Sequence, residues 1–290
     1  MTTYQEAWGQ GARLLAQADL QGSRLDAQVL LGSVVGMDRS RLLAYPEQTL
    51  TSEQEQNYWS FIQRRCEHEP VAYIVGHKEF YGLDFSVDQR VLIPRPETEL
   101  LVEEALSEIR QRIVQGQRPV VADVGTGSGA IPISIALEEP RLPYLYACDI
   151  SADALAVARE NCKRHHVTGR IRLLEGDLLA PIPEPVDVLL ANLPYVGQNE
   201  IDEMRSDVLD YEPHLALFSG PHGLDLLYRL CKEAATSGTL KSGGIILLEI
   251  GYQQCAALTK MLHQLWPQVT VDCQKDYAGW DRLLRVSLPS

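Results

Sequence analysis

The sequence predicts an α/β fold, in which a mostly parallel, doubly wound sheet with an antiparallel edge hairpin follows a small helical domain. Strand-like and helix-like segments alternate between residues 120 and 265, which is typical of parallel strands joined by right-handed crossovers. The last two strand candidates, 269–273 and 283–288, have only a loop between them and should pair as a hairpin. At 290 residues, the chain is long enough for one large and one small domain.

Residues 1–75 have the patterns of a small helical domain. Leu25 to Leu31 is apolar with helical spacing. Ser52 followed by Glu55 is a capping-box pattern, in which two side chains satisfy free N–H groups at the start of a helix. We therefore expect this part of the chain to form a helical domain of its own.

Residues 76–96 have a different periodicity. Apolar residues alternate on either side of Tyr81-Gly82, which indicates a hairpin or an extended linker. The α/β domain is predicted to cover 97–290, and its first helix begins with Glu97 and Glu99, whose carboxylates are favourable in a first helical turn. The strand and helix candidates that follow are 120–124, 130–138, 144–149, 152–164, 171–175, 186–191, 224–235, 244–250 and 253–265.

The composition disfavours some partners. A net charge of −13 opposes tracking along a phosphate backbone, because nucleic-acid affinity comes largely from lysine and arginine. We therefore expect a protein or small-molecule substrate and no direct nucleic-acid contact. The sequence has neither a signal-peptide pattern nor an apolar run of membrane-spanning length, so we expect a cytoplasmic protein without membrane contact. We also expect a monomer.

The cysteines and histidines show no metal-binding pattern. The six cysteines are scattered, without a C-x-x-C pair and without clustering with histidine. No H-x-x-x-H pair or carboxylate cluster has the spacing of metal ligands. We therefore predict reduced thiols and no bound metal.

A glycine-rich loop directly follows the first predicted strand of the sheet. Glycines at alternate positions let the backbone turn tightly and approach a ligand without a Cβ atom in the way. The helix that begins after the loop points its free N–H groups at that ligand, as in many nucleotide sites. The residues expected to hold a nucleotide-like cofactor here are Asp123, Gly125, Thr126, Gly127, Ser128 and Gly129. Asp123 is expected to orient the loop and not to touch the reacting atoms.

Two further aspartates follow the next two strands. Asp149 ends the second strand about 20 residues after the glycines, where a carboxylate can accept both ribose hydroxyls. Asp177 follows the third strand and is expected beside an adenine ring. A dinucleotide-binding site stays open at this point, because its G-x-G-x-x-G pattern tolerates alanine where this chain has Ala130.

Asn192-Leu193-Pro194-Tyr195 follows the strand 186–191, which puts it beside the glycine loop if the two strands are neighbours. An NH2 group on an amide or on adenine is a poor nucleophile, so an enzyme must hold both hydrogens and aim the nitrogen. The Asn192 side-chain oxygen and the Leu193 carbonyl can each accept one hydrogen, and Tyr195 can stack on the planar group. Pro194 restrains Leu193 towards an extended conformation. The two segments together indicate methyl transfer to an amide or amino nitrogen, with Asn192 facing both cofactor and acceptor.

With these residues, the chain resembles the HemK/PrmC family of peptide chain release factor glutamine methyltransferases over nearly its whole length. The resemblance includes the segment Ile93-Pro-Arg-Pro-Glu-Thr-Glu99, which is the most specific of its motifs. Besides the two motifs above, it extends to 70–76, 80–87, 91–99, 211–213 and 223–224.

The resemblance implies a Rossmann-like class I methyltransferase domain after a helical domain that recognises the release factor. The enzyme would use S-adenosylmethionine, with S-adenosylhomocysteine as product, to methylate the glutamine of a Gly-Gly-Gln loop and so support translation termination. By position, residues 125–129 and Asp149 would contact the cofactor, and 192–195 would hold the glutamine amide.

Two residues depart from the family pattern and leave alternatives open. Leu193 replaces the first proline of Asn-Pro-Pro-Tyr, a form also found in enzymes that dimethylate adenine in ribosomal RNA. Leu178, which by the resemblance would lie at the adenine of the cofactor, stands where the family can carry an aromatic residue. An adenine N-methyltransferase acting on RNA or DNA is therefore the alternative, although the acidic charge opposes it. A nucleotide-dependent oxidoreductase or a noncatalytic cofactor-binding module would leave 192–195 unexplained.

Overall fold

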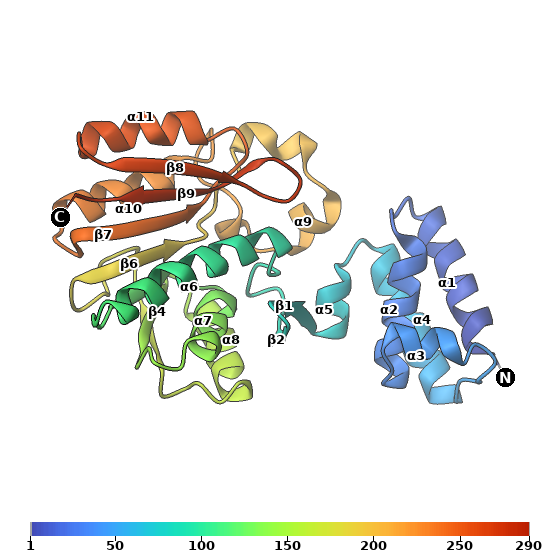
Figure 1. Cartoon of the computed structure of the whole chain (residues 1–290). Helices are drawn as coiled ribbons and strands as arrows, with labels where there is room; N and C mark the ends of the chain where they lie inside the picture. Colours follow the sequence, from blue (N-terminus) through green and yellow to red (C-terminus); the bar gives the residue numbers. More distant parts are fainter. Residues whose placement is uncertain (1, 290) are drawn as a thin grey trace. The chain divides into compact units, whose positions relative to one another are not determined.

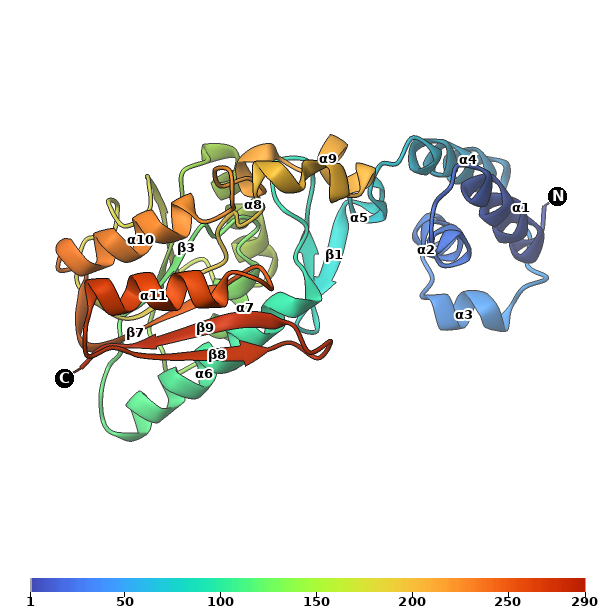
Figure 2. The same ribbon diagram turned by 90° about the horizontal axis from the view of Figure 1, so that it is seen from above.

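The computed structural model describes residues 2–289 and divides the chain into two compact units. Unit 1 contains Met1–His77 and Arg205–Tyr211, and unit 2 contains Lys78–Met204 and Glu212–Ser290. Figures 1 and 2 show the elements of each unit from perpendicular directions. Each unit has a hydrophobic core of its own. Within the described residues, no helix combines the length and the apolar character needed to cross a membrane.

Unit 1 is helical, as the periodicity of its sequence predicts. Its core contains fully buried apolar side chains from four helices, among them Leu15, Leu30, Leu42 and Ile62. The helices in its first segment are α1 (Tyr4–Gln17), α2 (Ser23–Val35), α3 (Arg39–Ala44), α4 (Ser52–Cys66) and α5 (Val71–Val75).

The cap of α4 corrects one expectation. Thr51 is the cap residue, because its backbone is extended and its side chain accepts from the Gln54 N–H at 3.2 Å. The Gln54 side chain accepts in return from the Thr51 N–H at 3.0 Å. Ser52 is already the first helical residue, so the predicted box of Ser52 and Glu55 is wrong. Both registers satisfy the capping pattern, and the chain uses the one that begins a residue earlier.

Helix α9 (Ser206–Tyr211) belongs to unit 1, although it lies far along the chain. The Tyr211 hydroxyl donates to the Glu67 carbonyl at 2.6 Å, and Asp207 lies 3.7 Å from the Arg65 guanidinium. Arg65 is buried, and a buried guanidinium is stable only with carboxylates around it. These contacts hold α9 to the first helices. The domain boundaries expected after residues 75 and 96 remain predictions.

A two-stranded hairpin of β1 (His77–Phe80) and β2 (Leu83–Ser86) follows α5, and all of its residues but His77 belong to unit 2. Its turn has positive φ at Tyr81 (53°) and Gly82 (72°), as a two-residue hairpin turn that matches the twist of the strands requires. The Phe80 side chain is buried in the core of unit 2. The hairpin therefore forms part of the wall of this unit.

Unit 2 is built on a seven-stranded sheet with the order β5-β4-β3-β6-β7-β9-β8. The first five strands in this order pair in parallel, whereas β9 pairs antiparallel with both β7 and β8. The strands are β3 (Val121–Val124), β4 (Leu145–Asp149), β5 (Ile171–Glu175), β6 (Val186–Ala191), β7 (Leu240–Glu249), β8 (Thr270–Lys275) and β9 (Asp281–Ser287). The predicted fold class, with its antiparallel edge hairpin, is confirmed.

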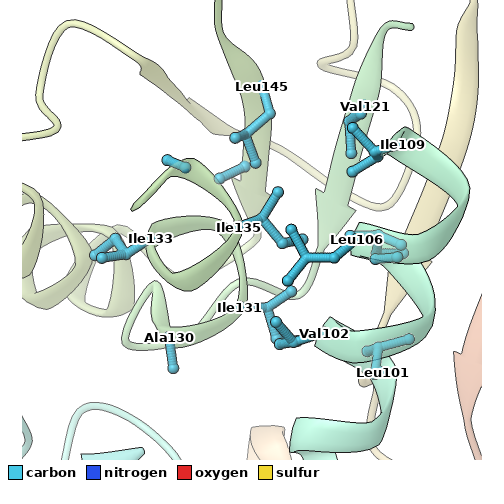
Figure 3. Close-up of a cluster of buried hydrophobic side chains, with 14 of the residues drawn as sticks. Leu101, Val102, Leu106, Ile109, Val121, Ala130, Ile131, Ile133, Ile135 and Leu145 are labelled. Carbon is cyan, nitrogen blue, oxygen red and sulfur yellow. The ribbon is translucent and has the colours of Figure 1, made fainter. Parts of the chain in front are cut away.

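Helices cover both faces of this sheet (Figures 1 and 2). One face is covered by α6 (Glu99–Val114), α7 (Ala130–Glu138) and α8 (Ala152–Arg164), and the other by α10 (Asp225–Thr236) and α11 (Cys255–Leu265). Figure 3 shows Leu106 of α6 and Ile135 of α7 close to Val121 and Leu145 of the sheet. Such close-packed cores deform little, so the strand ends present their loops at fixed positions.

Strands β3 and β6 are neighbours, with Asp123 opposite Leu190 and Val124 opposite Ala191. The chain leaves β3 towards β4 and β5 on one side and then returns to β6 on the other. In open α/β sheets, ligands bind at this switch point, outside the carboxyl ends of the strands. The glycine loop and the segment 192–195 therefore emerge side by side, as predicted.

Candidate active site

A cavity of about 300 Å³ lies at the carboxyl ends of β3, β4 and β6, among residues of unit 2. Its volume is within the range of small-molecule sites. The predicted site residues that line it are Gly125, Thr126, Gly127, Ser128, Asp149, Asp177, Leu178, Asn192, Leu193 and Pro194. Asp123, Gly129 and Tyr195 are not among the lining residues. The structure thus brings most of the predicted residues to one cavity.

The glycine loop leaves room in front of its backbone. Gly125, Gly127 and Gly129 have φ of 77°, 53° and 80°, in the left-handed region that favours glycine. A Cβ atom on Gly127 would meet no atom within 4 Å, so the space before it is open. A Cβ atom on Gly125 would lie 2.8 Å from Leu193 Cδ2. Glycine at 125 therefore permits the close approach of the two strand tips.

Asp149 and Asp177 line the cavity with different partners. The Asp149 carboxylate accepts from the N–H groups of Gly127 and Ser151, both at 2.9 Å, and burial raises its pKa. It thereby ties the glycine loop to the end of β4. Asp177 accepts from Arg229 at 2.6 Å in a half-exposed ion pair. The contacts expected for Asp149 with ribose and for Asp177 with adenine remain predictions.

Asp123 lies in β3 beneath the loop and is fully buried. Neither of its carboxylate oxygens has a hydrogen-bond partner among the described residues, and the same holds for the Thr126 hydroxyl. Burial raises the pKa of Asp123 to about 7, while the Thr126 side chain opposes this rise and Asp149 adds to it. A buried carboxylate without a partner is unfavourable when ionised. Burial thus favours the neutral form of Asp123, and the protein offers little to stabilise its ionised form.

We expect Asp123→Asn to change how the free energy of unfolding depends on pH. Folding raises the Asp123 pKa from 3.8 to about 7. The contribution of Asp123 to the stability of the wild type is therefore full below pH 3.8 and is lost as pH rises through about 7. The neutral amide has no such loss. A pKa change of one unit corresponds to about 1.4 kcal/mol. Between about pH 5 and pH 8, the free energy of unfolding of the variant should therefore rise by about 3 kcal/mol relative to that of the wild type.

Urea unfolding of both proteins at the two pH values, without added ligand, measures this gain. The other titrating groups are common to both chains, so they largely cancel in the comparison. A stability difference that does not change with pH would contradict the picture of Asp123 as a buried, uncompensated carboxyl group.

The segment 192–195 reaches the cavity with three of its four residues. Asn192 Nδ2 donates to the Thr98 hydroxyl at 3.0 Å, and Leu193 is buried. Among the described residues, no backbone N–H outside the helices and strands donates to the Leu193 carbonyl. Tyr195 directs its hydroxyl to Glu249 at 3.2 Å, and burial raises its pKa. Stacking of Tyr195 on a substrate group remains a prediction.

The backbone at Tyr195 is held by the loop after β7. Gln254 Nε2 donates to the Tyr195 carbonyl at 2.8 Å and lies 3.3 Å from the Gly223 carbonyl, while its Oε1 accepts from the Gly251 N–H at 2.9 Å. Gly223 has φ of 71°, and a Cβ atom there would overlap the Tyr195 carbonyl oxygen. The backbone of Tyr195, at the end of the segment 192–195, is thus held by Gln254 on one side and by the close approach of Gly223 on the other.

Sequence reasoning missed many of the residues at or near the cavity, among them Thr98, Arg229, Glu249 and Gln254, whose side chains bond to residues of the predicted site. Thr98 is part of the specific segment 93–99, but no residue of that segment was given a role at the site. Glu249 is a carboxylate at a strand end, the same signal that identified Asp149. Arg229 and Gln254 lie on or just before helices and carry no comparable signal, because tertiary packing brings them to the site.

Among the residues that the structure describes, one group could ligate a metal ion. Cys255, Cys273 and Asp281 offer ligand atoms within 4.8 Å of one another, away from the cavity lining. Lys275 already donates to Asp281 at 2.9 Å. Burial and the neighbouring Cys255 raise the pKa of Cys273 to about 12, which keeps its thiol protonated. The expected absence of a metal remains a prediction.

Comparisons with known proteins also distinguish two parts of the chain. Two family models cover separate parts of the chain: the PrmC N-terminal domain matches residues 6–76, and the methyltransferase small domain matches residues 97–209. A methyltransferase structure from Pyrococcus furiosus has a TM-score of 0.52 at 17% identity, covering 81% of this chain and 100% of that one. The catalytic domain of hMettl16 in complex with a 3′UTR hairpin has a TM-score of 0.55 at 15% identity, covering 82% of each chain. At these identities the likeness shows the fold alone.

Curated relatives share much more of the sequence. A release factor glutamine methyltransferase of Koribacter versatilis is 43% identical over 253 residues, covering 86% of this chain and 87% of the relative. One of Moorella thermoacetica is 41% identical over 281 residues, covering 97% of this chain and 96% of the relative. The match thus includes both the helical part and the cavity. The chain therefore belongs to the family of release factor glutamine methyltransferases.

Proposed function

We propose that this protein transfers a methyl group from S-adenosylmethionine to the side-chain amide nitrogen of the glutamine in the Gly-Gly-Gln loop of peptide chain release factors. Its relatives, which are named for glutamine methylation of release factors, support this reaction. The observation that carries the proposal is the meeting of the glycine loop and Asn192 at one cavity, with Gly125 against Leu193. A cofactor and an NH2 group can then be held face to face.

The residues at the cavity fit S-adenosylmethionine. When bound, this molecule supplies an electrophilic methyl group on a positively charged sulfonium. The open backbone at Gly127 and the carboxylate of Asp149 suit a nucleoside. A cation bound near the buried Asp123 would favour its ionised form. We propose that residues 125–129 and Asp149 hold the cofactor, with Asp177 and Leu178 at its adenine end.

The acceptor end fits the NH2 group of a carboxamide. The nitrogen lone pair is delocalised, so the site must fix both hydrogens and direct the face of the nitrogen. Asn192 Oδ1 and the Leu193 carbonyl are proposed to accept one hydrogen each, and Pro194 keeps the second acceptor in place. No strong base is needed before transfer, because the nitrogen loses its proton more easily once it is alkylated.

Unit 1 is proposed to recognise the release factor, as the family resemblance implies. The proposal includes a cytoplasmic location, a monomeric enzyme and no direct contact with nucleic acid. The net charge of −13 supports the last point, because binding to phosphates depends on a positive surface.

The proposal is tested by incubating the protein with labelled S-adenosylmethionine and three acceptors: a release factor, its Gln→Ala loop variant, and ribosomal RNA. We expect label in the release factor only. Label in ribosomal RNA and none in the release factor would favour the adenine N-methyltransferase that Leu193 leaves as the alternative.

A further inference from the structure

Polar side chains form a continuous hydrogen-bonded chain beside the cavity. Glu249 ends β7 and is 1% exposed, and Thr98 ends the 3-10 helix η1 (Pro96–Thr98) and is 4% exposed. The Thr98 hydroxyl donates to Glu249 Oε2 at 2.6 Å. Asn192 Nδ2 donates to Thr98 Oγ1 at 3.0 Å, and the Tyr195 hydroxyl donates to Glu249 Oε1 at 3.2 Å. The Thr98–Glu249 pair thus links the end of β7 to Asn192.

The direction of these bonds follows from the hydrogens available. A threonine hydroxyl carries a single hydrogen, and its short bond to a carboxylate uses it. Glu249 accepts from the Thr98 hydroxyl at Oε2 and from the Tyr195 hydroxyl at Oε1, so both of its oxygens act as acceptors. Burial raises the pKa of Glu249, and the Thr98 hydroxyl and the charge of Arg282 oppose that rise. The Thr98 oxygen can then only accept from Asn192. The NH2 end of the Asn192 side chain must therefore face Thr98.

The other end of this amide, Oδ1, is left for the cavity. Asn192 lines the cavity. Its Oδ1 atom does not appear among the buried side-chain atoms that lack a hydrogen-bond partner in the described residues. The two ends of an asparagine amide have nearly the same shape, so packing alone does not choose between them. Turned the other way, Asn192 would present NH2 to the NH2 of the acceptor, and two donors form no hydrogen bond.

We infer that Thr98 and Glu249 are positioning residues that fix the Asn192 side chain with Oδ1 towards the acceptor. They thereby make the site select an acceptor that offers N–H groups, such as a carboxamide, over one that offers only oxygens, such as a glutamate carboxylate. This inference rests on the proposed function. In this role, both residues act through Asn192 and not on the reacting atoms.

Thr98→Val tests the inference, because it removes the hydroxyl at nearly constant shape, and Thr98→Ser is the matched control that keeps it. In Thr98→Val, kcat on a release factor should fall about 10- to 100-fold, while KM and the Kd for S-adenosylmethionine should change less than about threefold. Thr98→Ser should recover most of kcat. Adding Glu249→Gln to Thr98→Val should cost little more, because the link to Asn192 is already broken.

Two further measurements keep the inference falsifiable. Thr98→Ala is a second variant of different size and should show the same loss of kcat. The side-chain ¹⁵N–¹H resonances of Asn192 report its hydrogen bond without any acceptor, and they should move in Thr98→Val but much less in Thr98→Ser.

Undiminished kcat in Thr98→Val, equal losses in the Val and Ser variants, or Asn192 resonances that stay in place would each overturn the inference. Wild-type enzyme assayed in parallel reports separately on the proposed function. If it leaves the release factor unlabelled, the proposed function fails, and the resonances still decide which end of Asn192 faces Thr98.

Discussion

Asn192→Ala is expected to lower kcat for release factor methylation by about a thousandfold, while the Kd for S-adenosylmethionine stays within about threefold of wild type. The Asn192 side chain reaches the cavity from the end of β6, whereas the glycine loop and Asp149 follow other strands. Loss of a group that orients the acceptor nitrogen destabilises the transition state, and it affects the binding of the cofactor much less. Single-turnover kinetics and titration calorimetry measure the two quantities separately.

Asn199→Ala is the matched control for this variant. Asn199 is an exposed asparagine in the 3-10 helix η2 (Gln198–Glu203) shortly after this segment and does not line the cavity, so its removal should leave kcat near the wild-type value. If Asn192→Ala lost cofactor affinity in parallel with kcat, Asn192 would be assigned to cofactor binding, and its proposed role towards the acceptor would be wrong.

Gly223→Ala should lower the free energy of unfolding by about 2 to 5 kcal/mol and remove most of the activity. Gly223 has φ of 71°, and an added Cβ atom would overlap the Tyr195 carbonyl oxygen and lie 2.8 Å from Gln254 Nε2. A backbone carbonyl cannot turn aside as the end of a long side chain can. The bond from Gln254 to Tyr195 must therefore break, and the segment 192–195 must shift. Urea unfolding and kcat measure both effects.

Gly238→Ala separates the two causes of this loss. Gly238 has almost the same φ, 72°, but a Cβ atom there would meet nothing within 4 Å. It should therefore show only the penalty of the left-handed backbone, about 1 to 2 kcal/mol. Equal losses in the two variants would mean that the close approach to Tyr195 is not what requires glycine at 223.

The parts of the fold that depend on local patterns could be predicted from the sequence. Strands β5 and β6 begin and end where their apolar runs predict, and the final hairpin pairs because only a loop separates its strands. The capping box of α4 begins one residue earlier than predicted, because two overlapping quartets of residues satisfy the same pattern. Local sequence could not choose between them.

The parts of the site that depend on distant partners could not be predicted in this way. The bond from Thr98 to Glu249 spans 151 residues, and the bond from Asn192 to Thr98 spans 94. No periodicity or spacing encodes these bonds, since each depends on how η1 and the ends of β6 and β7 come together. The same is true of Asp123, whose lack of a partner is a property of its burial.

Because unit 1 includes Arg205–Tyr211, the backbone passes between the two units three times. A fragment that starts at residue 78 would carry α9 without Arg65 and Glu67, to which Asp207 and Tyr211 are bound. A fragment that stops at residue 77 would lack α9 altogether. Neither fragment is a self-contained piece for separate expression, and a chimaera between two relatives would have to exchange 1–77 and 205–211 together.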